Sequence, residues 1–422
     1  MSSGDTLSPQ ALANLKLYKY SSVDKSFISN YVLRYYWNAC VKLLPMWLAA
    51  NMVTLLGFFL IIANVMLLQV TIPDLVGPGP VWVYWSFAFA LWGYSTMDNI
   101  DGKQARRTGT SSPLGELFDH GIDSLNCTLA SLLETAAMGF GPTHIGAFTA
   151  MVPVLPMFFS TWETYHTHTL YLGVFNGPTE GLIIATSIMA ISGYYGPQVW
   201  QTPVSDLIGL ENIFGDLSWR EGWVPLLLIA FFTAHLPACV YHVVNARRAA
   251  NLPVLPVFLE WTSMLIFCGS CLAWLGSPHS NLLKDNHLVL WCLTMSFVFG
   301  RLTTKIILCH LTRQPFPFFS VMLVPLIGGA VLAQGPSFEL WSAWSPTTEF
   351  RYLQGYFVFA VVAYFTWAVR VINAICKVLE INCLTIKKRK VDADEADKGK
   401  KEIENETPAA NGELRRSTRK KA

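Results

Sequence analysis

Residues 98–123 read DNIDGKQARRTGTSSPLGELFDHGID. This stretch carries two pairs of aspartates. Asp98 and Asp101 are three positions apart, and Asp119 and Asp123 are four positions apart. Side chains at these spacings share one face of a helix. The sequence therefore predicts two helices, each presenting one pair of carboxylates on one side.

A helix start separates the two pairs. Ser112 is a typical N-cap residue, and Pro113 suits the first helical position. The acidic residues lie at the end of one apolar segment, 81–100, and near the beginning of another, 113–139. About 20 apolar residues cross the roughly 30 Å of hydrocarbon in a bilayer. We therefore expect the aspartates to lie on membrane-spanning helices.

Four carboxylates at membrane depth require compensation. An aspartate near the centre of a spanning helix costs about 2.5–3.5 kcal/mol. Facing carboxylates suit hard divalent cations such as Mg²⁺, and two such ions could clamp a pyrophosphate. Alternatively, the acids pair with Lys103, Arg106 and Arg107 at a wet membrane surface. Surface pairing gives no reason for Gly102 and Gly115, whereas a bound ligand needs the close backbone approach that glycine allows.

The composition extends the membrane interpretation to the whole chain. Of 422 residues, 52% are hydrophobic and 14% are charged, whereas soluble domains carry about 25% charged residues. We predict an all-α polytopic membrane protein with about ten transmembrane helices. The predicted spans are 47–70, 81–100, 113–139, 144–165, 180–196, 223–246, 254–275, 287–310, 316–333 and 353–379.

The chain outside the spans divides into distinct parts. Residues 25–42 mix aromatic and basic side chains, which predicts an N-terminal amphipathic helix at the membrane interface; a buried soluble helix is the alternative. The end of the chain is polar and rich in Lys and Glu, so we expect disorder there. The predicted units are an N-terminal segment (1–46), catalytic helices (47–200), additional transmembrane helices forming a lipid-acceptor chamber or dimer interface (201–380) and a tail (381–422).

The distribution of Lys and Arg predicts the orientation in the membrane. Basic residues gather before the first span and after the even-numbered spans, as at Lys103, Arg106, Arg247 and Arg248. Loops after odd-numbered spans carry few basic residues and several acids. Cytosolic loops are enriched in Lys and Arg. Both termini are therefore predicted to be cytosolic, together with the loop between the second and third spans.

The aspartate stretch resembles the full motif of the CDP-alcohol phosphotransferases. The matching residues are Asp98, Asp101, Gly102, Ala105, Arg106, Gly115, Asp119 and Asp123. The resemblance narrows to the eukaryotic choline and ethanolamine phosphotransferases, which are ten-span proteins of about this length. It is carried by WLAANMVTLLG (47–57), DGKQARR (101–107), GELFDHG (115–121), YHTHTL (165–170) and NGPTEG (176–181).

This resemblance implies an enzyme with a defined chemistry. It would transfer phosphocholine or phosphoethanolamine from CDP-choline or CDP-ethanolamine to diacylglycerol, releasing CMP. Two Mg²⁺ ions would assist, with Mn²⁺ able to substitute. The resemblance also implies a homodimer in the endoplasmic reticulum membrane, with the Golgi as a second location. The expected partners are the CDP-alcohol, diacylglycerol and the lipid bilayer, with no nucleic acid.

The resemblance also assigns site residues. Metal binding falls to Asp98, Asp101, Asp119 and Asp123, and substrate binding to Asn51, Gly102, Arg106, Gly115 and Glu116. Arg106 would contact phosphate through its planar guanidinium, and Asn51 would contact the cytidine end of the donor. A charge that sets topology is the alternative for Arg106, and a polar helix start is the alternative for Asn51.

The group that takes the acceptor's proton is predicted to be His120. The wider family points to the last aspartate, here Asp123, but a metal-bound carboxylate is a poor base. An imidazole with a pKa of about 6.5 is a better one, and the choline and ethanolamine branch has histidine at this position. A histidine that only supports the site is the alternative. His166 and His168 suggest an interfacial loop rather than a metal site.

Two other functions remain compatible with the sequence. The acceptor could be another alcohol, such as inositol or glycerol phosphate, although relatives of that kind are usually shorter. The protein could also be a transporter with an ion site, which gives no reason for the aspartate–glycine spacing. No residue distinguishes choline from ethanolamine.

Overall fold

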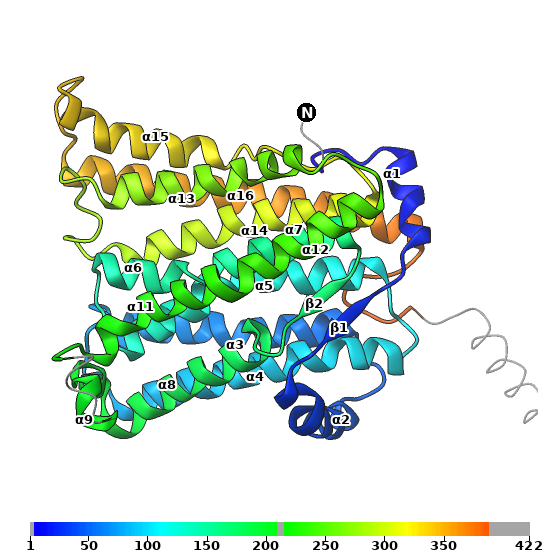
Figure 1. Cartoon of the computed structure of the whole chain (residues 1–422), viewed down its shortest axis with the longest axis horizontal. Helices are drawn as coiled ribbons and strands as arrows, with labels where there is room; N and C mark the ends of the chain where they lie inside the picture. The colour runs from blue at the N-terminus through cyan, green and yellow to red at the C-terminus, as the bar shows by residue number, and fades with distance from the viewer. Residues whose placement is uncertain (1–3, 209–214, 388–422) are drawn as a thin grey trace, which may run out of the picture.

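Long helices lie side by side and form the body of the molecule (Figure 1). The computed structural model describes residues 4–208 and 215–387. The longest helices are α3 (Ala50–Thr71), α4 (Val81–Arg107), α5 (Pro113–Ala137), α14 (Leu288–Thr312) and α16 (Pro346–Leu379). The others are α1 (Pro9–Asn14), α2 (Arg34–Leu43), α6 (His144–Met151), α7 (Val154–Thr167), α8 (Leu182–Tyr195), α9 (Val204–Ile208), α11 (Trp219–Ala230), α12 (Leu236–Ala249), α13 (Thr262–Leu275) and α15 (Leu323–Gln334).

Each predicted span coincides with helix over most of its length, which confirms an all-α polytopic membrane protein. Within the described residues, six helical segments are long and apolar enough to cross a membrane. These are Ala50–Thr71, His144–Thr167, Trp219–Ala249, Leu255–Leu275, Leu288–Thr312 and Pro346–Leu379. The α4, α5, α8 and α15 helices are not among these six segments. The α4 and α5 helices carry the charged stretch 98–123, and α8 and α15 are shorter.

Prolines cause three departures from the predicted spans. The fourth span is two helices, because the chain turns at Val152 and Pro153 between α6 and α7. The sixth contains a π-helical turn at Phe231–His235, just before Pro237. The ninth begins at Leu323 rather than at 316, after an extended stretch containing Pro315 and Pro317. Proline lacks the N–H that an α-helix needs and clashes with the preceding turn.

The helices that carry the aspartates are held by close packing. A Cβ added at Gly57 of α3 would lie 3.0 Å from the Met97 Cβ of α4. One added at Gly300 of α14 would lie 2.6 Å from the Leu125 side chain of α5. Small residues of this kind let membrane helices approach closely. The α4–α5 pair is therefore supported by α3 and by α14.

A helix is present where the interfacial helix is predicted. A π-helical turn at Ser29–Leu33 leads into α2, which is seen nearly end-on in Figure 1 and so crosses the direction of the bundle. Leu33, Trp37 and Val41 pack against α3 and α4, while Tyr31 and Tyr35 are exposed. Half-buried helices with exposed aromatic rings are typical of the membrane interface.

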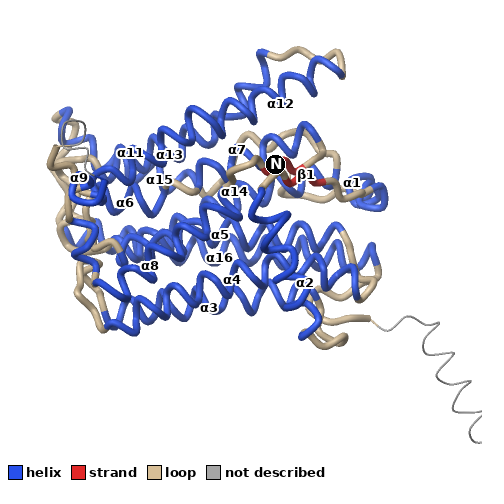
Figure 2. Tube along the Cα trace, turned by 60° about the horizontal axis from the view of Figure 1, so that its bottom comes forward, coloured by secondary structure: helices blue, strands red, loops and turns tan. Residues whose placement is uncertain are grey.

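The N-terminal segment crosses one end of the bundle. Its β1 (Ser22–Asp24) pairs in parallel with β2 (Leu170–Leu172), which follows α7; both are visible in Figures 1 and 2. Ahead of α1, the Asp5 carboxylate lies 3.1 Å from Arg301 Nη2 and 3.0 Å from Lys305 Nζ. The segment is thus tied to α14. Of the predicted tail, residues from 388 on lie outside the described residues.

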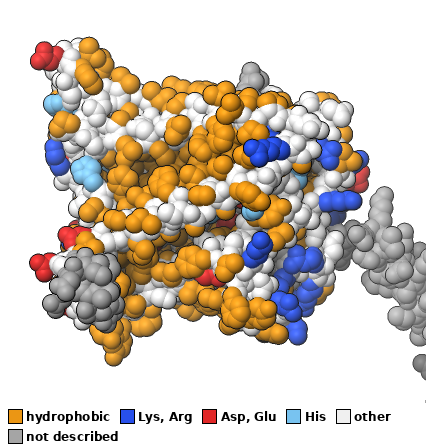
Figure 3. Space-filling model, in the orientation of Figure 1, with side chains coloured by type: hydrophobic (Ala, Val, Ile, Leu, Met, Phe, Trp, Pro, Cys, Tyr) orange, Lys and Arg blue, Asp and Glu red, His pale blue; other side chains and the backbone are white. Residues whose placement is uncertain are grey.

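The two ends of the bundle differ in charge. In Figure 3, most of the visible Lys and Arg side chains gather at the end where α4, α12 and α14 finish. Visible Asp and Glu side chains are more frequent at the opposite end, and hydrophobic side chains cover much of the surface between the two ends. This distribution is that of a protein spanning a membrane with one basic side.

Candidate active site

The four aspartates come together between α4 and α5. The α4 helix continues through Arg107, so both Asp98 and Asp101 lie on it. The α5 helix begins as predicted: the Ser112 side chain accepts a hydrogen bond from the Gly115 N–H, and Pro113 occupies the first turn. The two helices meet around one acidic centre near this turn.

Within that centre, each carboxylate of α4 lies opposite one of α5. Asp98 lies near Asp123, and Asp101 lies near Asp119, each pair close enough for the two negative charges to interact strongly. Oxygen atoms of Asp119 and Asp123 and a ring nitrogen of His120 lie within 4.8 Å of one another. Like charges at this separation repel strongly in a low-dielectric environment, so the arrangement needs a positive charge to balance it.

Two hydroxyl groups orient one carboxylate of each helix. The Thr54 hydroxyl of α3 donates a hydrogen bond to Asp101, and the Tyr94 hydroxyl of α4 donates one to Asp123. Both donors are buried. Other oxygens have no such donor: Asp98 Oδ1 and Asp119 Oδ1 are buried without a hydrogen-bond partner among the residues described. Buried polar atoms normally have partners, so these oxygens are available for a ligand.

His120 lies beside the carboxylates. Its Nδ1 is 3.4 Å from Asp119 Oδ2, but the two atoms lack the alignment of a hydrogen bond. The ring is mostly buried, with its side chain 17% exposed. Gly121, the next residue, packs against Thr304 of α14, which limits movement of this turn of α5. His120 is therefore held within reach of any substrate bound at the acidic centre.

The predicted substrate-binding residues surround the open side of this centre. A Cβ at Gly102 would meet only the Arg106 side chain, at 3.6 Å, so the backbone of α4 is accessible there. A Cβ at Gly115 would lie 3.8 Å from Asn51 Oδ1, which places Asn51 of α3 beside the start of α5. Asn51 Nδ2 donates to the Cys383 carbonyl oxygen at 3.0 Å, so the segment after α16 also reaches this point.

Glu116 links the centre to the N-terminal segment. It accepts a hydrogen bond from the Tyr18 hydroxyl, 98 positions away in the sequence. Burial and the Glu116 carboxylate raise the pKa of Tyr18, so its hydroxyl remains a donor at neutral pH. Leu15 packs against Leu114 and Leu117 on the first turns of α5. The N-terminal segment therefore forms one wall of the site.

Three of these residues were missed by sequence reasoning. Tyr94 lies one turn before Asp98 on α4, and Thr54 lies one turn after Asn51 on α3, so helical spacing could have indicated both. No local signal marks Tyr18, because its contact with Glu116 depends on how the chain folds back. All ten residues predicted for the site lie on α3, α4 or α5 around the acidic centre.

Comparison with known proteins agrees with this geometry. Residues 47–208 match the family model for CDP-alcohol phosphatidyltransferases. Cholinephosphotransferase 1 of Saccharomyces cerevisiae is 36% identical over 341 residues, covering 76% of this chain and 83% of that protein. Choline/ethanolaminephosphotransferase 2 of Arabidopsis thaliana is 35% identical over 390 residues, covering 90% of this chain and 97% of that protein. The chain belongs to the CDP-alcohol phosphatidyltransferase family.

Another relative shows that the likeness extends over the full length. A CDP-alcohol phosphatidyltransferase class-I family protein of Dictyostelium discoideum is 32% identical over 409 residues, covering 91% of this chain and 99% of that protein. The protein is therefore a transferase of this family, anchored in a membrane by apolar helices. The helices after residue 208 are part of the shared architecture with these relatives.

The acidic centre fits the divalent metal that CDP-alcohol phosphatidyltransferases use. Its donors are carboxylate oxygens from two helices, two of which are buried without a partner among the residues described. Hard divalent cations prefer oxygen ligands, and a cation would relieve the repulsion between Asp98 and Asp123 and between Asp101 and Asp119. The residues present therefore suit a divalent cation.

Proposed function

We propose that this transferase moves phosphocholine or phosphoethanolamine from CDP-choline or CDP-ethanolamine onto the hydroxyl group of diacylglycerol, releasing CMP. The main support for this proposal is the acidic centre, in which four carboxylates from α4 and α5 come together with His120 beside them. The names of the relatives from Saccharomyces cerevisiae and Arabidopsis thaliana support the choice of headgroup.

Asp98, Asp101, Asp119 and Asp123 would hold two Mg²⁺ ions, which Mn²⁺ could replace. When bound, such ions neutralise the pyrophosphate and stabilise the departing CMP. Other residues of the chain would hold the metal-binding carboxylates in place. Thr54 and Tyr94 orient one carboxylate on each helix, so less reorganisation is needed when the donor binds.

The remaining donor contacts would come from residues around the open side. Arg106 can form paired hydrogen bonds with phosphate oxygens, and Gly102 leaves its backbone accessible on the same side of α4. Asn51 and Gly115 lie together where the cytidine end would reach. Glu116, held by Tyr18, is a carboxylate suited to the positively charged end of the transferred alcohol.

His120 would act as the base. The acceptor oxygen forms a bond to the phosphorus that carries the alcohol, the bond from that phosphorus to CMP breaks, and the acceptor's proton passes to the His120 ring. Divalent cations of this type bind oxygen in preference to imidazole, which leaves His120 free for proton transfer. Asp123 is less suitable because it already accepts the Tyr94 hydroxyl hydrogen and faces Asp98.

Purified protein incubated with diacylglycerol, Mg²⁺ and each CDP-alcohol tests the proposal. Phospholipid and CMP should appear in equal amounts, and chelation of the metal should stop both. Absence of phospholipid with both donors would reject the assignment. Soluble alcohols such as inositol, offered in place of diacylglycerol, should give no product. The ratio of kcat/KM for the two donors, measured side by side, would define the headgroup preference.

The cellular context is also part of the proposal. We infer an endoplasmic reticulum location, extending to the Golgi, with both termini in the cytosol, and a homodimeric assembly. The division into residues 1–46, 47–200, 201–380 and 381–422 remains a prediction. Immunofluorescence of tagged protein tests the location, and mass measurement of the detergent-solubilised protein tests the dimer.

A further inference from the structure

A cavity lies at the basic end of the bundle, and one of its lining residues, His310, is near His120 of the acidic centre. It measures about 560 Å³, which is within the range of small-molecule sites. Three helices end around it: α7 at Thr167, α12 at Ala249 and α14 at Thr312. None of the ten residues predicted for the active site lines it. The proposed transfer reaction gives it no role.

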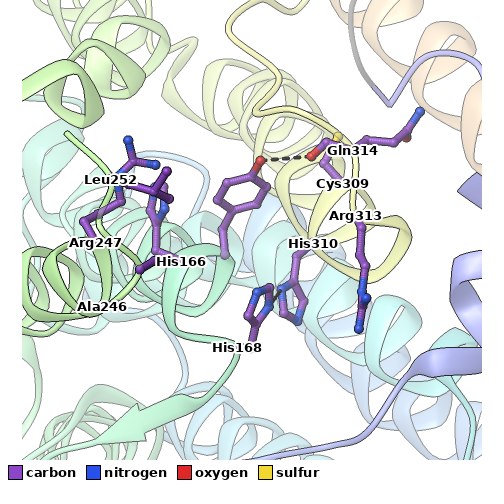
Figure 4. Close-up of a pocket in the computed structure, with 11 residues that line it drawn as sticks. His166, His168, Ala246, Arg247, Leu252, Cys309, His310, Arg313 and Gln314 are labelled. Atoms are coloured by element: carbon purple, nitrogen blue, oxygen red, sulfur yellow. Dashed lines mark hydrogen bonds between the residues drawn. The ribbon is translucent and has the colours of Figure 1, made fainter. Parts of the chain in front are cut away.

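Apart from the Tyr165 phenol and the Cys309 thiol, the charged and titratable side chains that line this cavity are basic. They are His166, His168, Arg247, His310 and Arg313, and no Asp or Glu is among the lining residues. Figure 4 shows Arg247 and His166 on one side, with His168, His310 and Arg313 on the other. The walls therefore offer positive charge and N–H donors from two directions. A group that carries negative charge would be held between them.

Two of these side chains are held in place. Arg247 donates from Nε and Nη2 to the Pro253 carbonyl oxygen at 3.2 and 2.8 Å, which fixes the plane of its guanidinium group. His166 Nε2 lies 2.6 Å from Glu260 Oε2, which also accepts from Trp162 Nε1 at 2.8 Å. Side chains that are already ordered lose less entropy when they bind a ligand.

A third element of the wall is a pair of histidines from different helices. His168 Nδ1 and His310 Nδ1 are 3.1 Å apart, and the two rings stack with centroids separated by 5.0 Å. The pair connects the end of α7 to the end of α14 and forms the wall opposite Arg247 (Figure 4). The cavity is therefore bounded on both sides by ordered nitrogen-bearing groups.

Basic residues at helix ends often serve only to complement the helix dipole, but here a backbone N–H already donates to one carbonyl oxygen near the end of each helix. The Leu252 N–H donates to the Arg247 oxygen, the Gln314 N–H to the Cys309 oxygen and the His168 N–H to the Thr164 oxygen. The side chains of Arg247 and Arg313 are thus not needed as capping donors.

The surroundings of the cavity indicate what kind of anion it would take. Leu252, which lines it, is 47% exposed, and Leu255 and Leu259 just beyond are 82% and 65% exposed. Such leucines suit contact with acyl chains at the edge of a bilayer. Basic pockets between membrane helices bind the head groups of anionic lipids. Guanidinium groups match phosphate geometry well.

We propose that this cavity binds the phosphate group of an anionic phospholipid from the adjacent leaflet. Arg247 and Arg313 contact the phosphate oxygens, and the acyl chains lie along the exposed leucines. The lining includes none of the residues predicted for catalysis, and phosphate binding there needs no metal. A soluble phosphate compound offers the same phosphate chemistry without the acyl chains. The test must therefore distinguish binding of a phospholipid from binding of a soluble phosphate compound.

Equilibrium binding to the full-length protein in detergent micelles tests this inference, with EDTA present to exclude the acidic centre. The probe is fluorescent dioctanoyl phosphatidic acid, and the competitors are unlabelled phosphatidic acid, inorganic phosphate and dioctanoyl phosphatidylcholine. The variant is Arg247→Gln combined with Arg313→Gln. The matched control is Arg248→Gln, which removes the neighbouring arginine that does not line the cavity.

Saturable binding in EDTA is expected, weakened about tenfold or more in the double variant and unchanged in Arg248→Gln. Unlabelled phosphatidic acid should compete far better than inorganic phosphate or phosphatidylcholine. The double variant should retain transferase activity in zwitterionic lipid, which shows that it folds. Equal affinity in the double variant and the unmodified protein would overturn the site. If inorganic phosphate competed as effectively as phosphatidic acid, the cavity would bind free phosphate rather than a phospholipid, and the proposal would be wrong.

Discussion

At the scale of single residues, the site separates groups that hold charge from a group that moves a proton. The aspartates face each other across α4 and α5, and two of their oxygens lack hydrogen-bond partners among the described residues. His120 stands beside them, 3.4 Å from Asp119. Under the proposed function, losing His120 and losing an aspartate should therefore have different kinetic consequences.

The first prediction concerns His120. His120→Ala should lower kcat by roughly 10²- to 10⁴-fold, the usual contribution of a general base, while metal-dependent binding of the CDP-alcohol persists. Steady-state kinetics and equilibrium binding on the same preparation measure both quantities. Ser124→Ala removes a hydroxyl that donates to the His120 carbonyl oxygen, so it serves as a control for the His120 backbone without changing the His120 ring. A near-normal kcat in His120→Ala would eliminate it as the base.

The second prediction compares a ligand with the residue that supports a ligand. Tyr94→Phe removes the hydroxyl that holds Asp123 and should weaken metal affinity by roughly 10- to 100-fold, so that added Mg²⁺ restores turnover. Asp119→Asn should abolish turnover at every Mg²⁺ concentration. Titration of activity against Mg²⁺ distinguishes them. Recovery of Asp119→Asn after a small increase in Mg²⁺ would show that Asp119 is not a direct ligand.

At the scale of elements, the N-terminal segment is part of the site rather than an appendage. Tyr18 holds Glu116, Leu15 packs on α5 and Asp5 lies between Arg301 and Lys305 of α14. These contacts tie a segment near the start of the chain to two helices that follow much later. Changes in this segment should therefore affect both donor binding and stability.

The third prediction concerns Tyr18. Tyr18→Phe keeps the ring but removes the hydrogen bond to Glu116, and a bond to a charged group contributes about 1.5–3 kcal/mol. The KM for the CDP-alcohol should rise by roughly tenfold or more, with a smaller effect on kcat. Tyr31→Phe, on an exposed ring of the same segment, is the matched control. If both variants bind the donor alike, Glu116 does not depend on Tyr18.

The fourth prediction concerns Asp5. Asp5→Ala removes the carboxylate that pairs with Arg301 and with the buried Lys305, and breaking a buried pair costs about 3–5 kcal/mol. Because Asp5 is itself part-exposed, the free energy of unfolding should fall by about 2 kcal/mol. Thermal unfolding of the purified protein would show a lower Tm. An unchanged Tm would mean that this contact does not anchor the segment.

At the scale of the whole molecule, charge and hydropathy determine how the bundle lies in the membrane. Most of the visible basic side chains occupy one end (Figure 3), and six segments among the described residues are long and apolar enough to cross a membrane.

The fifth prediction concerns the side of the membrane on which the two termini lie. If both termini face the cytosol, as proposed, tags on either terminus should be digested by protease added to sealed microsomes. Protection of either tag would reverse the proposed orientation.

The sequence predicts those features of the fold and site that depend on residues close together in the chain. The spacing of the aspartates and the Ser112 and Pro113 start predicted how α4 and α5 present their carboxylates, because helical geometry fixes which side chains share a face. It could not predict the pairing of Ser22 with Leu170 or of Tyr18 with Glu116, because such contacts depend on tertiary folding. The division of the fourth span at Pro153 shows that proline can outweigh an apolar pattern.

Under the proposed function, carboxylates from α4 and α5 bind a divalent cation and, through it, the donor's pyrophosphate. Isothermal titration of CDP-choline into the purified protein, without acceptor, tests this directly. Binding should be saturable with Mg²⁺, absent with EDTA and absent in Asp101→Asn, whose partners Thr54 and Asp119 remain. Donor binding of equal affinity with and without a divalent cation would contradict the account.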